Sequence, residues 1–270
     1  MDTRSEFVWF YWAQGFDASP YLVKRCYESW KKHNSDRRVI FLDDIELSNL
    51  KLFTEEENKV MDKLSLPHKS DLIRLKLLIE YGGTWVDSTV FCLKPLSDWC
   101  TTERFPFFFK NNKRDRIISN WFINVEADSD ILRMLYDRLL SHWNKVDGYE
   151  NSYFHLFMTK VFNAITSLNL RFNHLWFRFD FLKLQPYFIF HYELLRLLTE
   201  NEHWMLDFKR RCIYSADGPH YFHQAGFDVK VPDDVNLIRS VTEEKMLKLN
   251  WRTELDPSAN SFLYYIFSKF

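Results

Sequence analysis

The stretch KSDLIRLKLLIEYGGTWVDSTV, residues 69–90, contains the side chains best suited to chemistry. Asp71 and Arg74 are three residues apart, so in a helix they share one face. Asp87 stands in an apolar run between Trp85 and Val90, where a carboxylate is costly to bury without a partner. That partner could be a metal, a sugar hydroxyl or only a neighbouring arginine. An Arg74–Asp87 ion pair that ties a helix to a sheet is the purely structural alternative.

The elements that must position these residues can be read from the same stretch. Ser70 is suited to cap a helix, which would place Asp71 in the first turn, where the helix dipole favours an acid. Gly82 and Gly83 are suited to end the helix. The run TWVDSTVFCL then predicts an extended strand in which Asp87 and Thr89 point one way and Ser88 the other.

The rest of the chain predicts an α/β protein. EFVWFYWAQG (residues 6–15) indicates a buried strand, residues 19–34 a helix begun by Ser19 and Pro20, and RRVIFLDD (residues 37–44) a second strand. This strand–helix–strand order favours a parallel sheet. We expect one domain over residues 1–270, with a helical, aromatic-rich flank or insertion at about residues 128–205.

Bulk composition excludes several classes of protein. Lys plus Arg (36) nearly balance Asp plus Glu (37), so no overall field favours nucleic acid. The four cysteines form no Cys-x-x-Cys pair, which argues against a zinc site or a thioredoxin motif. The N-terminus lacks a signal-peptide pattern, and no apolar stretch has the length of a membrane span. A cytoplasmic protein with reduced thiols is expected.

Several blocks of the sequence resemble the capsular polysaccharide synthesis proteins. These are residues 69–90 above, the N-terminal residues 8–44, FFFKNNKRDRIISNWFI (residues 107–123) and YSADGPHYF (residues 214–222). That family is related to the glycosyltransferase family 32 sugar transferases, which carry an Asp-x-Asp motif, and to the glucosylating bacterial toxins. The resemblance implies a GT-A fold: a Rossmann-type mixed sheet flanked by helices that binds a nucleotide sugar at the carboxyl ends of its strands.

The resemblance also implies roles for residues of the opening stretch. Asp71 would bind sugar hydroxyls, and Arg74 the diphosphate or the sugar, since a guanidinium binds phosphate bidentately. Asp87 matches the first acid of the Asp-x-Asp motif, which holds the nucleotide and a metal, Mn²⁺ or Mg²⁺. Thr89 takes the place of the second acid, and a hydroxyl is a poor ligand for a hard cation. Glu243 could supply a missing metal ligand.

Other residues are candidates for the donor site. Trp12, with Tyr11 beside it, falls where related enzymes stack an aromatic ring on the base, whereas Trp9 is expected in the core. SADGPH (residues 215–220) could present Asp217 and His220 to the acceptor or the phosphates, and its alternative is an ordinary turn. The catalytic candidates are Arg74, Asp87 and Asp217.

The function implied is transfer of a hexose from a UDP-sugar to a growing, lipid-linked saccharide in capsular or surface polysaccharide synthesis, with retention of configuration. One alternative is a non-catalytic nucleotide-sugar or saccharide-binding module on the same fold; another is transfer to a protein acceptor. Aromatic and basic residues alternate in RFNHLWFRFDFLK (residues 171–183) and SFLYYIFSKF (residues 261–270). These mixtures predict peripheral membrane contact, unless the rings pack on one another.

Overall fold

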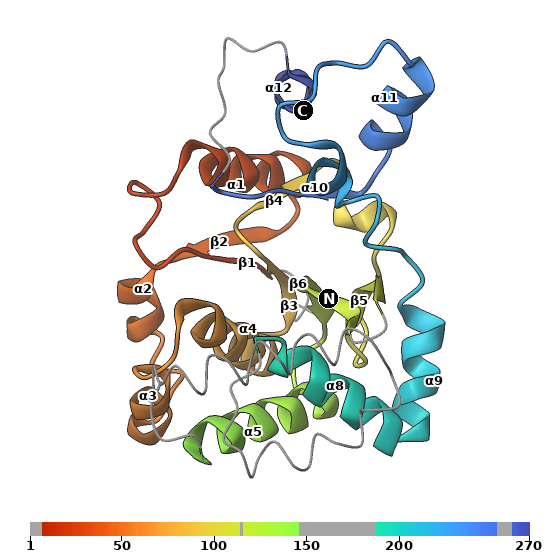
Figure 1. Cartoon of the computed structure of the whole chain (residues 1–270). Helices are drawn as coiled ribbons and strands as arrows, with labels where there is room; N and C mark the ends of the chain where they lie inside the picture. Colours follow the sequence, from red (N-terminus) through yellow and green to blue (C-terminus); the bar gives the residue numbers. More distant parts are fainter. Residues whose placement is uncertain (1–6, 114–115, 146–186, 253–260) are drawn as a thin grey trace, which may run out of the picture.

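A five-stranded mixed sheet forms the centre of the computed structural model, which describes residues 7–113, 116–145, 187–252 and 261–270 (Figure 1). The strand order is β2-β1-β3-β6-β5. β1 runs parallel to β2 and β3, whereas β6 pairs antiparallel with β3 and β5. The strands are β1 (Phe7–Tyr11), β2 (Arg38–Leu42), β3 (Gly83–Val86), β5 (Phe107–Lys113) and β6 (Arg116–Val125). The predicted α/β class and its parallel start are confirmed.

Both faces of the sheet are covered, which explains the nearly unbroken apolar sequence of β1. Val8 and Phe10 point into one apolar cluster, and Trp9 and Tyr11 point into the other. Figure 1 shows α4, α5 and α8 on one side of the sheet and α1, α10 and α12 on the other. The helices are α1 (Tyr21–His33), α2 (Asp44–Asn49), α3 (Glu55–Met61), α4 (Leu66–Tyr81), α5 (Asp130–Lys145), α8 (Ile189–Glu200), α9 (Glu202–Arg211), α10 (Tyr221–Ala225), α11 (Val235–Thr242) and α12 (Phe262–Lys269).

Two helix starts differ from the expected ones. α1 begins after Pro20, and the Ser19 hydroxyl donates to the Phe16 carbonyl oxygen instead of capping the helix. α4 begins at Leu66, with a proline in its first turn, so the prediction that Ser70 caps it is wrong. Proline is favoured at the first helical positions because its missing N–H would lack a partner there in any case. Asp71 therefore lies in the second turn, beyond the strongest part of the helix dipole.

The predicted long strand after α4 is interrupted by a turn. β3 ends at Val86, and the amide of Val90 donates to the carbonyl oxygen of Asp87 (2.9 Å), which closes the turn. The chain then continues as β4 (Val90–Cys92), which leaves the main sheet and pairs with β7 (Met246–Lys248). The expected continuous strand is thus wrong at residues 87–89, although Asp87 and Thr89 still face the same side chain, that of Lys248.

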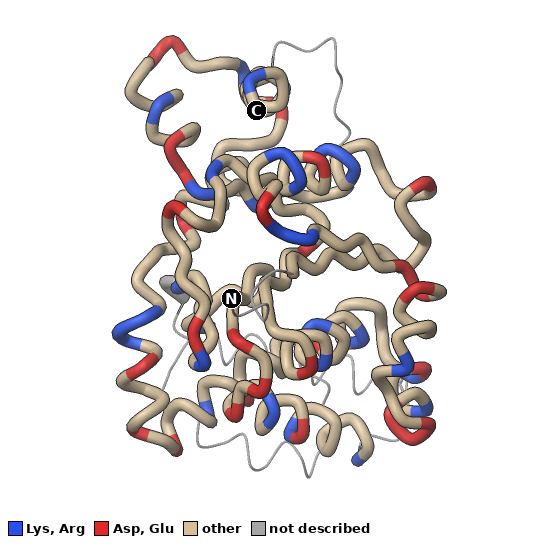
Figure 2. The backbone as a smooth tube through the Cα atoms, turned by 180° about the vertical axis from the view of Figure 1, so that it is seen from behind, with Lys and Arg blue, Asp and Glu red and all other residues tan. Residues whose placement is uncertain are grey.

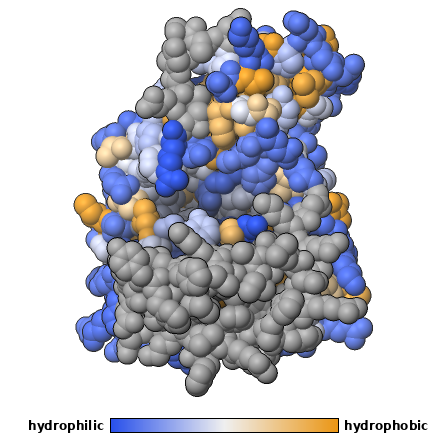
Figure 3. Space-filling view, in the orientation of Figure 1, coloured by the Kyte–Doolittle hydropathy of each residue, from blue (hydrophilic) through white to orange (hydrophobic). Residues whose placement is uncertain are grey.

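Charged residues of both signs are intermixed (Figure 2), whereas apolar side chains on the face in Figure 3 appear at particular places. In Figure 2 acidic and basic residues are intermixed along the elements seen from behind. In Figure 3 the described side chains across the middle of the molecule are mostly hydrophilic, and apolar ones appear near α11 and α12. Among the described residues, no helix is both long and apolar enough to cross a bilayer.

The aromatic tail packs largely onto the protein itself. Phe262, Leu263, Ile266 and Phe267 of α12 are buried, while Tyr264 is exposed. The alternative of rings packing on the chain therefore describes most of the tail. Residues 171–183, the other stretch expected at a membrane, lie outside the described residues. The same holds for residues 146–186 of the expected helical flank.

Candidate functional site

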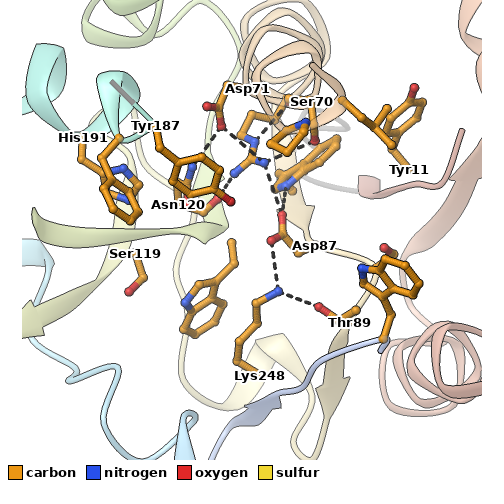
Figure 4. A pocket seen from close by; sticks show the side chains of 18 of the residues that line it. Tyr11, Ser70, Asp71, Asp87, Thr89, Ser119, Asn120, Tyr187, His191 and Lys248 are labelled. Atoms are coloured by element: carbon orange, nitrogen blue, oxygen red, sulfur yellow. Dashed lines mark hydrogen bonds and ion pairs between the residues drawn. The ribbon is translucent and has the colours of Figure 1, made fainter. Parts of the chain in front are cut away.

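A cavity of about 870 Å³ opens at the carboxyl ends of β1 and β3. The segments that follow these two strands line it, together with α4, β6, the start of α8 and the end of β7. Figure 4 shows Ser70 and Asp71 on one side and Lys248 reaching toward Asp87 and Thr89 from the other. The cavity lies where open α/β sheets bind their ligands, at the carboxyl ends of parallel strands.

Arg74 occupies the centre of this site and is only 5% exposed. Its Nη1 donates to the carbonyl oxygen of Asn120 at 2.6 Å. Its Nη2 lies 3.4 Å from a carboxylate oxygen of Asp71 and 3.4 Å from one of Asp87. The structural ion pair considered from the sequence therefore exists, and the same guanidinium also lines the cavity. Arg74 is held in place before any ligand binds.

Asp71 is buried against polar partners. The side-chain amide of Asn120 donates to its carboxylate at 3.0 Å. Burial raises the pKa of Asp71 to about 6, although Arg74 opposes that rise. The nearby negative charge of Asp87 acts in the same direction as burial. Burial thus leaves Asp71 easier to protonate than an ordinary carboxyl group.

Asp87 has stronger charge compensation. The Trp85 indole donates to one carboxylate oxygen at 3.0 Å, and Lys248 Nζ lies 3.1 Å from the other. Burial would raise the pKa of Asp87, but Lys248 and Arg74 outweigh it and the pKa falls below its usual value. Asp87 is thus ionised at neutral pH, which answers how a carboxylate is tolerated in this apolar run.

Lys248, the last residue of β7, is a site residue that the sequence reasoning missed. Its ammonium donates to Asp87 and, at 2.6 Å, to the hydroxyl of Thr89. The one available signal was a single charge within the run Met246-Leu247-Lys248-Leu249, the same pattern that drew attention to Asp87. Nothing in that run indicates which distant residue the lysine meets.

The donor atoms around Asp87 and Thr89 bear on the metal ion that the resemblance implies. Thr89 and Asp87 do lie together, but a lysine nitrogen lies against both of them. Glu243 is exposed and pairs with Arg239 at 2.7 Å, and it does not line the cavity. Within the described part of the chain, no three His, Cys, Asp or Glu side chains are arranged to hold an ion. Because the Lys248 ammonium contacts both Asp87 and Thr89 and would repel a cation between them, these residues do not fit a divalent metal ion.

Aromatic side chains border the cavity beyond β1. Trp12 lines it, and its ring lies 5.8 Å from that of Trp251 at 77°. Tyr11 also lines it, but its hydroxyl donates to Asp44. Trp9 is buried and donates to the Gly82 carbonyl oxygen, as expected of a core residue. Of these three rings, Trp12 and Tyr11 therefore line the cavity, whereas Trp9 does not.

Of the two candidate residues in the SADGPH turn, Asp217 and His220, only His220 lines the cavity. His220 lines the cavity, with its Nδ1 2.8 Å from the Ala216 carbonyl oxygen. Burial lowers the pKa of His220 to about 4, so the ring is neutral at pH 7. Asp217 is exposed and does not line the cavity, so the structure does not bring it to the other candidates.

Further lining residues come from β6 and α8. The guanidinium carbon of Arg116 lies 3.8 Å from the centre of the Phe188 ring. His191 is buried, and burial lowers its pKa to about 3, with Arg116 and Arg74 adding to the effect. The sequence did not predict Arg116, His191 or Asn120 as site residues, because no local pattern distinguishes them from ordinary strand and helix residues.

Comparison with known proteins adds independent information. The profile of the capsular polysaccharide synthesis protein family matches residues 1–178. The O-glycosyltransferase braB of Annulohypoxylon truncatum is 30% identical over 36% of this chain and 26% of its own length. The glycosyltransferase afumC of Aspergillus fumigatus is 33% identical over 37% of this chain and 28% of its own. The chain thus matches about a quarter of the length of these two relatives.

More distant similarities also concern glycosyltransferases. An uncharacterized glycosyltransferase of Acanthamoeba polyphaga mimivirus is 23% identical over 52% of this chain and 57% of its own length. The solved structure titled PaToxG Glycosyltransferase is 15% identical, with a TM-score of 0.44, over 54% of this chain and 63% of that one. Because the family profile covers well over half of its residues, the chain belongs to the capsular polysaccharide synthesis protein family.

Proposed function

We propose that this protein is a glycosyltransferase that moves a hexose from a UDP-sugar to a saccharide acceptor in capsular or surface polysaccharide synthesis. Family membership and the named relatives support glycosyl transfer. The observation that carries the proposal is the alternation of charges Asp71, Arg74, Asp87 and Lys248 within one cavity. Its volume is within the usual range for sites of small molecules and cofactors.

Each part of a nucleotide sugar finds suitable groups in this cavity. Trp12 offers a ring for the base, because aromatic faces stack on nucleobases. Arg74 and Lys248 offer positive charge to the diphosphate. The carboxylates of Asp71 and Asp87 can accept hydrogen bonds from sugar hydroxyls, and charged acceptors make the stronger bonds.

The transfer step can be written with its atoms balanced. The bond between the anomeric carbon and the phosphate oxygen breaks, and its electron pair leaves with the diphosphate. The acceptor hydroxyl oxygen forms the new bond to that carbon, and its proton passes to a phosphate oxygen of the departing UDP. Fixed cations beside the diphosphate stabilise the charge that develops there.

We assign no protein nucleophile. Asp87 accepts hydrogen bonds from Trp85 and Lys248, and Asp71 accepts one from Asn120. Carboxylate oxygens engaged in this way are suited to orient hydroxyls rather than to attack carbon. Retention of configuration, a lipid-linked acceptor, a cytoplasmic location and peripheral membrane contact are parts of the same proposal.

The experiment is a panel of UDP-sugars in which release of UDP is measured with and without saccharide acceptors. Turnover with one donor supports the enzyme. Tight donor binding without any turnover would instead support a binding module, and no binding of any UDP-sugar would refute the proposal.

A matched pair of variants connects turnover to the site. Asp87→Asn removes one charged hydrogen-bond acceptor, which is worth about 1.5 kcal/mol, and should slow turnover about tenfold. Asp128→Asn makes the same change at an exposed residue that pairs with Arg133 outside the cavity, and should leave turnover unchanged.

A further inference from the structure

Lys248 occupies the place at which the Asp-x-Asp motif would hold its cation. Its ammonium nitrogen lies 3.1 Å from a carboxylate oxygen of Asp87 and 2.6 Å from the hydroxyl oxygen of Thr89. These are the two residues that match the first and second acids of the motif. A positive charge supplied by the chain itself therefore lies between the two expected ligands.

Replacing the second acid by Thr89 and the metal ion by Lys248 conserves the net charge of this part of the site. Two carboxylates and a divalent cation sum to zero, and so do one carboxylate and one ammonium. Replacing the second acid by Thr89 removes a negative charge, and Lys248 supplies one positive charge fewer than the metal. The substitution at Thr89 is thus explained together with the lysine, because a second buried carboxylate here would lack compensation.

Backbone pairing fixes the lysine in this position. β7 pairs with β4 such that Lys248 lies opposite Val90, and its amide donates to the Pro219 carbonyl oxygen at 2.8 Å. On the other side, the amide of Leu249 donates to the Thr89 carbonyl oxygen at 2.8 Å. The side chain is 17% exposed, so the ammonium is held at the cavity wall.

The ammonium retains capacity for a ligand. A lysine side chain has three N–H donors, and Asp87 and Thr89 accept from two of them. The third can donate to an oxygen of a phosphate group that enters the cavity. Lysine binds phosphate as a compact point charge, which suits the terminal oxygens of a diphosphate.

We propose that Lys248 performs the task of the divalent metal, so that this protein binds the donor diphosphate and transfers the sugar without a metal ion. The inference rests on the proposed donor. As the bond between the anomeric carbon and the phosphate oxygen breaks, the electron pair stays on the diphosphate. Lys248 stabilises it by a hydrogen bond and keeps its own protons, while the acceptor proton passes to a phosphate oxygen.

The first test uses the unaltered protein and titration calorimetry with UDP, once in EDTA and once in Mn²⁺. We expect dissociation constants that agree within about threefold, because metal and nucleotide are then not linked. Binding of UDP only in Mn²⁺ would overturn the role of Lys248 while leaving the nucleotide-sugar donor intact.

The second test uses Lys248→Met in EDTA, with Lys245→Met as the matched control. Loss of a charged hydrogen bond of at least 1.4 kcal/mol should weaken UDP binding about tenfold or more. Lys245 lies over the Tyr214 ring and does not line the cavity, so its variant should bind like the unaltered protein. Equal affinity of Lys248→Met and the unaltered protein would overturn the inference.

Inorganic pyrophosphate in EDTA separates this inference from the choice of nucleotide. If UDP does not bind under either condition, the uridine donor is wrong. Pyrophosphate binding that is lost in Lys248→Met would then still support a lysine that holds diphosphate. No pyrophosphate binding in the unaltered protein would overturn both.

Discussion

Replacing Arg74 by methionine should test how the carboxylates of the site are held. The guanidinium is buried and contacts both Asp71 and Asp87. Removing one partner of a buried ion pair costs about 3–5 kcal/mol, because it leaves an uncompensated charge in the interior. Arg74→Met should therefore lower the free energy of unfolding by about that amount at pH 8, and it should also abolish transfer.

The loss of stability in Arg74→Met should depend on pH, and the pKa of Asp71 sets the direction of that dependence. With Arg74 present, burial already raises the pKa of Asp71 to about 6, against about 3.9 in an unfolded chain. Since Arg74 lowers that pKa, the variant should have a higher one. A raised carboxyl pKa means that the folded state binds more protons, so stability falls as pH rises from the unfolded to the folded pKa. In the variant this fall continues above pH 6, by about 1.4 kcal/mol per pH unit.

The assay is urea unfolding followed by tryptophan fluorescence at pH 5 and at pH 8. The difference between Arg74→Met and the unaltered protein should be smaller at pH 5, where Asp71 takes up a proton. Arg133→Met is the control, since Arg133 pairs with Asp128 at the surface with 52% of its side chain exposed. Such surface pairs contribute about 0–1 kcal/mol. An Arg74→Met loss below 1 kcal/mol, or one equal at both pH values, would refute this account of the site.

Three further predictions concern separate features. Asp71→Asn removes the carboxyl whose pKa burial raises to about 6, so the fall in stability between pH 4 and pH 6 should shrink by about 3 kcal/mol; an unchanged urea–pH profile would contradict this. Gly83→Ala would place a methyl group 2.4 Å from the Phe7 carbonyl oxygen at a φ of +91°, so it should cost about 2 kcal/mol or more; a thermal melt within 2 °C of the unaltered protein would argue against that close approach. Trp12→Ala should weaken UDP binding about tenfold in calorimetry through lost stacking, and unchanged affinity would remove Trp12 from the base site.

The sequence by itself determined the local elements and the chemical character of the site. The helix predicted over residues 19–34 is present as α1, and the apolar run of residues 6–15 predicted the buried strand β1. The pair Asp71 and Arg74, followed by a carboxylate in an apolar run, indicated a charged site near a strand end. These features follow from rules that act over a few residues, namely helical periodicity, strand alternation and the cost of a buried charge.

Tertiary structure alone decided which distant groups complete the site. The turn at residues 87–89 brings Asp87, Ser88 and Thr89 all to the cavity, whereas alternation along one strand would have turned Ser88 away. The turn also carries β4 out of the main sheet. Pairing of β4 with β7 then brings Lys248 against residues about 160 positions earlier in the chain. The same packing leaves Asp217 and Glu243 at the surface. Such contacts depend on hydrogen-bond ladders between segments far apart in sequence, and no pattern within either segment specifies its partner.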